Sequence, residues 1–565
     1  MINSKQPIKI LSWIIFLLSL ILLGLCIRAA YVTYLFPVYP DEIAENILLT
    51  RFGYDFPIKF DLMPMCRAIS PAYPKWWYFP AFLEWLLYGH TFNLKVFRSI
   101  GIITSWLIFI LLSVQIYRKN INLFKTNLTK ILFYFLALGC VLALFNIGVV
   151  PFSLVTNRPE AGILLLLIIS IMLFEIPVKN KIQSMWIALG FFVCVSLLFY
   201  SHAKTFLLIP FLCIIAHRLF SHFKNTYIYI ALWILFVLMA FKNYVSWTNT
   251  FTLCPDSPII STIFSSFNVN LQNIFYAPKQ FLLEIYTNLL TYQIDIDRIS
   301  FQPTTEINYL PPIKVGPRIV QLNTLIYWNY LAIFFLLITA NSFSYLRDLL
   351  KRKIITTNLL SLTLLICTFI SLLINNTKHW YDAGYIWVLL SLAALIYFSE
   401  QIPYLLKRGI NYFFYFFTGY FLIVAIASVW ILIHNYELPL RGGFAGPSIP
   451  LANYHYKKLK KQFDQLASEC NIDVNNSKNL ILDDYTYYHF QKSKYPLSYT
   501  YLFYGPDQKF LATFWNKFQI DGIIIRAAPI PEKVRKYSVQ IDGVLCVPKK
   551  NIRPFFMEMF GIQGK

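Results

Sequence analysis

The sequence predicts a polytopic α-helical membrane protein with a soluble α/β domain at its C-terminus. The 565 residues are 57% hydrophobic and only 13% charged, and the mean hydropathy of +0.55 is far above that of a soluble domain. Long apolar runs recur over residues 1–434 at lengths suited to crossing a bilayer. Beyond residue 435 a linker rich in Pro and Gly leads into short apolar runs, which are typical of buried strands.

Each transmembrane element is predicted from one apolar run. A helix needs roughly 20 residues to cross the hydrocarbon core, and about eleven runs approach that length. They lie at 10–33, 95–117, 131–151, 161–177, 184–200, 205–220, 226–242, 323–341, 357–375, 383–398 and 411–434. The first run follows Lys5 and Lys9 and has no small-residue cleavage site after it, so we expect a retained anchor rather than a removed signal peptide.

Basic residues predict how the helices are oriented. They gather in the N-terminal segment and in alternate loops, where the acidic residues are only Asp348, Glu400 and, at an edge, Glu175. The positive-inside rule makes these segments cytoplasmic. The N-terminus is then cytoplasmic, and two long loops (about 34–94 and 243–322) and the domain 435–565 face outward from the inner (plasma) membrane. This topology, with anionic headgroups, accounts for the net charge of +22, so no nucleic-acid partner is expected. The basic residues concerned are Lys5, Lys9, Arg118, Lys119, Lys125, Lys130, Lys179, Lys181, Arg218, Lys224, Arg347, Lys351, Arg352, Lys353, Lys407 and Arg408.

The outward segments contain further predicted elements. Residues 70–88 of the first loop carry Trp76, Trp77 and Trp85 among apolar residues, which favours a helix lying in the membrane interface over a platform for stacking sugar rings. An amphipathic stretch at 276–293 of the second loop is a second candidate interfacial helix. The C-terminal domain is predicted to contain a helix at 451–469 and strands at 479–482, 522–525 and 544–547.

The nine cysteines fall into two groups. One group lies in the apolar runs, where a cysteine packs as a small apolar residue: Cys26, Cys140, Cys194, Cys213 and Cys367. The other group, Cys66, Cys254, Cys470 and Cys546, lies in segments expected to face an oxidising compartment. Sequence does not fix connectivity. Our hypothesis is a Cys470–Cys546 bond within the terminal domain and a Cys66–Cys254 bond between the two long loops.

Ionisable residues avoid the middle of the spans and gather at their outer ends. A proton- or ion-coupled transporter usually needs such groups near mid-span, so this distribution disfavours a transporter. Some of these residues fit the simpler interpretation of solvated loops. The cations suit a lipid phosphate, and the carboxylates suit activation of a hydroxyl group. The set is Asp41, Glu42, Glu45, Arg51, Asp55, Asp61, Arg98, Arg158, Glu160, His202, Lys204, Lys378, His379 and Asp382.

Several of these residues lie in motifs that resemble a known superfamily. Val38-Tyr39-Pro40-Asp41-Glu42, directly after the first span, resembles the acidic motif of the GT-C glycosyltransferases, in particular the protein O-mannosyltransferase and aminoarabinose-transferase branch. Similar segments follow in the order of that branch: 87–90 with 96–100, Arg158-Pro159-Glu160, the Lys204 hairpin and 378–381. The resemblance covers about residues 10–400. Residues 70–77 lack the Pro-Pro pair common in that branch, which indicates a distinct subfamily.

The resemblance implies a GT-C-like membrane domain over residues 1–434 and a glycosyltransferase activity. A sugar would pass from a polyprenyl phosphate or diphosphate donor to an acceptor hydroxyl on the outer face, with inversion; the acceptor is a lipid, a protein or a glycan. Asp41 would be the general base, and Glu42 would position the acceptor or a cation. The candidates to neutralise the leaving phosphate are Arg158, Lys204, Lys378 and His379. Some relatives use a divalent metal, but no ligand spacing here indicates one.

Supporting roles are expected for Arg98, Glu160 and Tyr381. Arg98 either orients the carboxylates of the first loop or is a snorkelling arginine at a helix end. Glu160 suits a salt bridge to Arg158 better than a catalytic role. Two other functions remain open: a polysaccharide polymerase or ligase that uses a lipid-linked donor, and a transporter of lipid-linked glycans.

Overall fold

A computed structural model describes the chain except for several segments. The described residues are 6–36, 94–156, 159–201, 203–249, 268–291, 316–352, 355–376, 380–407, 411–442, 453–474, 479–483, 485–490, 495–498, 520–527 and 530–559. Within them, nine helices are long and apolar enough to cross a membrane. The chain is therefore a multi-pass helical membrane protein. The predicted tryptophan-rich helix at 70–88 lies outside the described residues.

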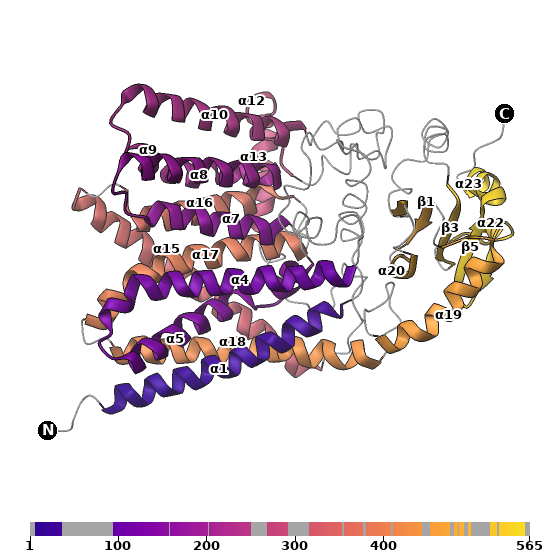
Figure 1. The fold of residues 1–565 in the computed structure, drawn as a ribbon, viewed down its shortest axis with the longest axis horizontal. Coiled ribbons are helices and arrows are strands. Elements are labelled where there is room, and N and C mark those ends of the chain that lie inside the picture. The colour runs from indigo at the N-terminus through magenta and orange to yellow at the C-terminus, as the bar shows by residue number, and fades with distance from the viewer. Residues whose placement is uncertain are drawn as a thin grey trace.

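The helices lie side by side in a bundle (Figure 1). Their bounds are α1 Gln6–Tyr34, α4 Leu94–Asn120, η2 Ile121–Leu123, α5 Asn127–Phe145, α6 Val150–Val155, α7 Pro159–Glu175, α8 Lys181–Ser201, η3 Ala203–Leu208, α9 Ile209–Phe220, α10 Thr226–Asn249, α12 Asn273–Tyr276, α13 Pro278–Leu290, α15 Pro317–Leu350, α16 Thr357–Ile374, α17 Trp380–Lys407 and α18 Asn411–Gly442. Helix α1 packs along α18 and α5, although they are far apart in sequence.

Two predicted spans are interrupted. The run at 131–151 divides into α5 and the short, fully buried α6, because Gly148 takes a left-handed conformation (φ 51°) and Pro151 starts a new helix. The run at 205–220 divides into the 3₁₀ turn η3 and the 12-residue α9, which has a proline in its first turn. The predicted span 161–177 is α7, with 17 residues.

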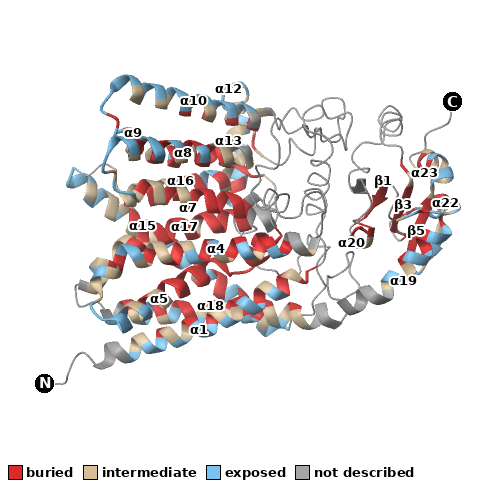
Figure 2. Cartoon of the chain, in the orientation of Figure 1, coloured by how far each residue is buried: buried red, intermediate tan, exposed pale blue. Residues whose placement is uncertain are grey.

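Helix packing follows from where small residues and apolar faces lie. Gly139 brings α5 close to α1: a Cβ at this position would lie 2.4 Å from Ser19 Oγ. Large apolar side chains elsewhere point outward, as on α10, whose outer surface is exposed along most of its length (Figure 2). Exposed apolar side chains on this scale fit a surface that contacts lipid rather than water.

The C-terminal segment forms a five-stranded mixed sheet in the order β2-β1-β3-β5-β4. The strands are β1 Asn479–Leu482, β2 Tyr495–Ser498, β3 Gly522–Arg526, β4 Val539–Ile541 and β5 Val544–Pro548, with helices α19 Asn453–Glu469, α20 Tyr487–Phe490, α22 Glu532–Arg535 and α23 Ile552–Met559 and the turn η6 Lys549–Asn551. The three predicted strands are β1, β3 and β5, and the predicted helix is α19. Asp542 and Gly543 both have positive φ (46° and 78°), which suits the tight turn between β4 and β5.

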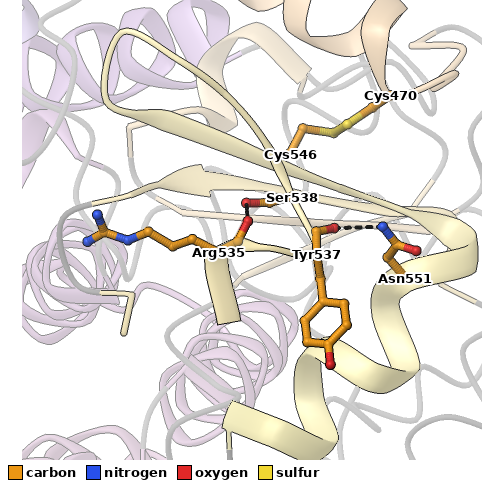
Figure 3. The surroundings of a disulfide bond; sticks show 6 residues. All are labelled: Cys470, Arg535, Tyr537, Ser538, Cys546 and Asn551. Atoms are coloured by element: carbon orange, nitrogen blue, oxygen red, sulfur yellow. Dashed lines mark hydrogen bonds between the residues drawn. A yellow bond between two sulfur atoms is a disulfide. The ribbon is translucent and has the colours of Figure 1, made fainter. Parts of the chain in front are cut away.

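The hypothesised Cys470–Cys546 bond is present (Figure 3). It ties the residue after α19 to β5, across 76 residues of sequence. Beside it, the Ser538 hydroxyl donates to the Arg535 carbonyl (2.7 Å) and the Asn551 amide donates to the Tyr537 carbonyl (2.9 Å). The five cysteines in the apolar runs are free thiols, as expected. The hypothesised Cys66–Cys254 pair lies outside the described residues.

Replacing both bonded cysteines with serine is expected to destabilise the C-terminal sheet. A crosslink across 76 residues restricts the unfolded chain, and its loss costs about 4 kcal/mol. Amide hydrogen exchange on the full-length protein should therefore become much faster in β3 and β5 of the variant. Cys213→Ser, which changes a free thiol in α9, should leave that exchange unchanged. Equal protection in the two variants would contradict a stabilising role for the bond.

His489 makes the stability of the same sheet depend on pH. Burial lowers the pKa of His489, and Asp464, whose Oδ1 lies 2.9 Å from Nε2, opposes that shift only in part. The native imidazole therefore binds its proton at a lower pH than the unfolded one, whose pKa is about 6.5. Stability is full above about pH 6.5 and falls as the pH drops toward the native pKa.

We expect hydrogen exchange in α19 and β1, corrected for its intrinsic pH dependence, to report lower stability at pH 5 than at pH 7.5. His489→Gln should reduce this difference because glutamine does not titrate. Asp464→Asn should enlarge it, since the opposing charge is removed. A pH dependence that is the same in His489→Gln as in the parent protein would show that another group is responsible.

Candidate functional site

The described helix ends that precede or follow the predicted site residues lie at one end of the helix bundle. Helix α1 ends there, α4 and α7 begin there, η3 joins α8 to α9 there, and α16 ends there before α17 begins. The described residues include Arg98, Glu160 and Lys204. Asp41, Glu42, Arg158, Lys378 and His379 lie outside them, as does the side chain of Tyr381, whose backbone is in α17.

Arg98 fastens the end of α1 to α4. It is fully buried, and its Nη1 donates to the carbonyl oxygens of Tyr34 (2.7 Å) and Phe36 (2.5 Å). The last carbonyls of a helix lack intrahelical partners and carry the negative end of the helix dipole, so a guanidinium is well suited to them. The interpretation of Arg98 as a snorkelling side chain is wrong, since a snorkelling group reaches water.

Aromatic contacts hold the same chain end from two other helices. The ring of Phe36 is buried and lies 4.8 Å from that of Phe152 in α6 and 5.1 Å from that of Tyr436 in α18. Nearly two turns before the end of α1, Arg28 forms a salt bridge with Glu437 of α18. The segment that leads to Asp41 therefore starts from a point fixed by α4, α6 and α18.

Glu160 is a buried carboxylate in the first turn of α7. This position is favourable for an acid because the N-terminus of a helix carries partial positive charge. Tyr385 of α17 is also buried. Gly384 of α17 faces Ser153 of α6, and a Cβ at this glycine would be in ordinary van der Waals contact with Ser153. The predicted pairing with Arg158 involves a residue outside the described part of the chain.

Lys204 is half-buried in η3, and the residues that follow it are anchored. Thr205 is fully buried and accepts a hydrogen bond from the Asn243 side chain of α10 (3.2 Å). Phe206 packs on Trp247, with ring centroids 4.7 Å apart. The part of η3 that follows Lys204 is therefore packed into the protein, which argues against the interpretation of a freely solvated loop.

The second long loop contributes α13, which is attached to the end of α16. The Asn288 amide donates to the Leu373 carbonyl (2.7 Å) and to Asn376 Oδ1 (2.8 Å), and the Val269 N–H donates to the Ile374 carbonyl (2.8 Å). The sequence predicts the amphipathic helix but not Asn288, since one asparagine on such a helix carries no special signal. Its contacts fix the chain two residues before Lys378.

The opposite face of α13 exposes apolar side chains: Leu282, Leu283, Tyr286, Leu289 and Leu290. An exposed apolar face on an amphipathic helix is what a helix in the membrane interface would have. The interfacial location of α13 stays a prediction.

Nothing in the described part of the chain brings together three or more His, Cys, Asp or Glu side chains that could hold a metal ion. Comparison with known proteins gives no assignment, because no protein-family model and no curated protein matches the chain.

Proposed function

We propose that this chain is a membrane glycosyltransferase of the GT-C type. It would transfer a sugar from a polyprenyl-phosphate donor to an acceptor hydroxyl on the extracytoplasmic face, with inversion at the anomeric carbon. The observation that carries the proposal is the attachment of Arg98 to the end of α1. A fully buried cation is costly to place in a protein, and here it fixes the chain at Phe36, five residues before Asp41.

The charged residues assigned to the site suit the same chemistry. Asp41 would accept the proton of the acceptor hydroxyl as its oxygen attacks the anomeric carbon. The bond from that carbon to the donor phosphate would break, and the electron pair would leave on the phosphate oxygen. Lys204, with Arg158, Lys378 and His379, would neutralise the charge that develops there. Glu42 would position the acceptor, while Glu160 and Tyr381 would support the site from α7 and α17.

The disulfide supports an extracytoplasmic location for the site. The bond lies in the segment that follows α18, and α18 approaches the end of α1 through Glu437 and Tyr436. Disulfides persist in oxidising compartments. The basic residues Arg118, Arg218 and Arg347 lie at the other ends of their helices, as the positive-inside rule requires for a cytoplasmic side.

Comparison of a strain that lacks the protein with its parent tests the activity. Mass spectrometry of glycans and polyprenyl-linked sugars is expected to show an acceptor without its sugar and an accumulated monosaccharide donor. A polymerase or ligase would instead leave short glycans or an unattached polymer. A transporter would leave the donor confined to the cytoplasmic leaflet. Unchanged glycans and lipid-linked sugars would overturn the proposal.

A further inference from the structure

A second polar site lies at the end of the bundle opposite to Arg98. It is a pocket of about 800 Å³ between the C-terminal halves of α4, α7, α9, α15 and α17 and the start of α16. Arg118, which lines it, is twenty residues beyond Arg98 on α4, a separation of about 30 Å at 1.5 Å per residue. The pocket is therefore distinct from the proposed transfer site and has no part in its chemistry.

The acidic residues of the pocket are already bonded within its wall. Lys119 forms salt bridges with both Glu175 and Glu400, and Glu175 also accepts a hydrogen bond from the Gln115 amide (2.9 Å). Asp348 accepts from the Asn358 side chain (2.7 Å). These contacts join α4, α7 and α17, and α15 to α16, so they build the wall of the pocket.

Three guanidinium groups line the same space. Within the described residues, Arg118, Arg218 and Arg347 have no carboxylate at salt-bridge distance. The Nε of Arg218 donates to the Phe174 carbonyl (3.0 Å), and the Arg347 guanidinium lies over the Tyr404 ring (5.3 Å from its centroid). Contacts of this kind hold the planar groups but leave other N–H donors available, and such donors bind phosphate oxygens well.

Two apolar residues of the lining, Leu111 and Val114, lie nearer the middle of α4 than the arginine on that helix. Leu111 and Val114 are one to two turns before Arg118 on α4, about 6–10 Å nearer the bilayer centre. A ligand that fills the pocket would thus meet charged groups at the surface and apolar groups below. This order matches a phospholipid, in which a phosphate is followed by glycerol and acyl chains, and it does not match a fully soluble phosphate.

We propose that this pocket binds the headgroup of an anionic phospholipid from the adjacent leaflet. The ligand phosphate would contact the three arginines, and its first acyl methylenes would lie against Leu111 and Val114. Basic pockets between transmembrane helices on the cytoplasmic side are suited to such headgroups. Since the ligand would touch α4, α9 and α15 at once, it would hold together three helices of the bundle.

The test is a titration of the purified full-length protein with phosphatidylglycerol and, separately, with phosphatidylcholine. Native mass spectrometry measures how much of each lipid is bound. Phosphatidylglycerol is expected to bind more tightly. Arg118→Gln/Arg347→Gln should weaken its binding by about 25-fold, at about fivefold for each arginine near an anionic headgroup. Arg352→Gln removes an exposed arginine that does not line the pocket, and should change binding less than twofold. Equal losses in these two proteins, or equal binding of the two lipids, would overturn the proposal.

A second variant tests whether the ligand is a phospholipid or a soluble phosphate. It leaves the charge of the pocket unchanged. Val114→Trp fills the apolar part of the pocket, so it should weaken phosphatidylglycerol binding at least tenfold while the arginines remain. Gel filtration of each variant verifies its fold, and Arg347→Lys, which keeps the charge, should retain most of the affinity. If glycerol phosphate binds the parent protein as tightly as phosphatidylglycerol, or if Val114→Trp has no effect, the assignment to a lipid is wrong.

Discussion

Asp41→Asn is expected to lower the rate of sugar transfer by about 10³-fold. Asparagine keeps the size and polarity of the side chain but cannot accept the proton of the acceptor hydroxyl. General-base catalysis contributes typically about 10² to 10⁴ to a rate, and a loss of 10³ corresponds to about 4 kcal/mol of transition-state stabilisation. The measurement is the initial rate of transfer from a polyprenyl-phosphate sugar by protein purified in detergent.

Two neighbouring acids provide the comparison. Glu45→Gln removes a carboxylate from the same segment and should change the rate little. Glu42→Gln should raise the KM for the acceptor more than it lowers kcat, because Glu42 is assigned to acceptor positioning. If Asp41→Asn keeps more than about a tenth of the parent rate while Glu42→Gln abolishes transfer, the two roles have been assigned in the wrong order.

The sequence predicts helices well here because a bilayer imposes a simple rule. A run of about 20 apolar residues must satisfy its backbone hydrogen bonds internally, and a helix does so. Hydropathy does not reveal where such a run is interrupted. The residues on both sides of Gly148 and of Pro210 are apolar, so hydropathy predicts one span at each place where the structure has two elements. The strands β1, β3 and β5 were predictable from buried apolar runs, whereas β4 is three residues long and only partly buried.

The candidate site was less predictable because its contacts join distant parts of the chain. A charged residue at the start of a span is ambiguous between snorkelling and burial, and only the fold brings Arg98 to the carbonyls of Tyr34 and Phe36. Asn288 is a similar case, since its partners Leu373 and Asn376 lie 85 and 88 residues away. The disulfide was easier to predict from the sequence, because few cysteines lie outside the apolar runs.

Arg98→Met is expected to impair both stability and activity. Methionine has a similar length but no donor, so the carbonyls of Tyr34 and Phe36 lose these bonds in a buried environment, which costs about 2–4 kcal/mol in all. The end of α1 would then be less firmly placed. Because a small misplacement of a reacting group can cost about 10²-fold, we expect kcat to fall about 100-fold in the protein that remains folded.

Arg28→Met is the matched control for Arg98→Met. Arg28 is also an arginine near the end of α1, but its side chain is not buried, and it bonds to the carboxylate of Glu437 rather than to the carbonyls at the helix end. Its loss should lower the Tm and kcat much less than the loss of Arg98, because the Phe36–Tyr436 contact still joins the end of α1 to α18. Arg98 acts through the chain before Asp41 and is a positioning residue, so its loss should reduce kcat with little change in the KM for the donor. A proportional rise in that KM would place Arg98 in donor binding instead, and equal effects of the two variants would remove the basis for the proposed anchor.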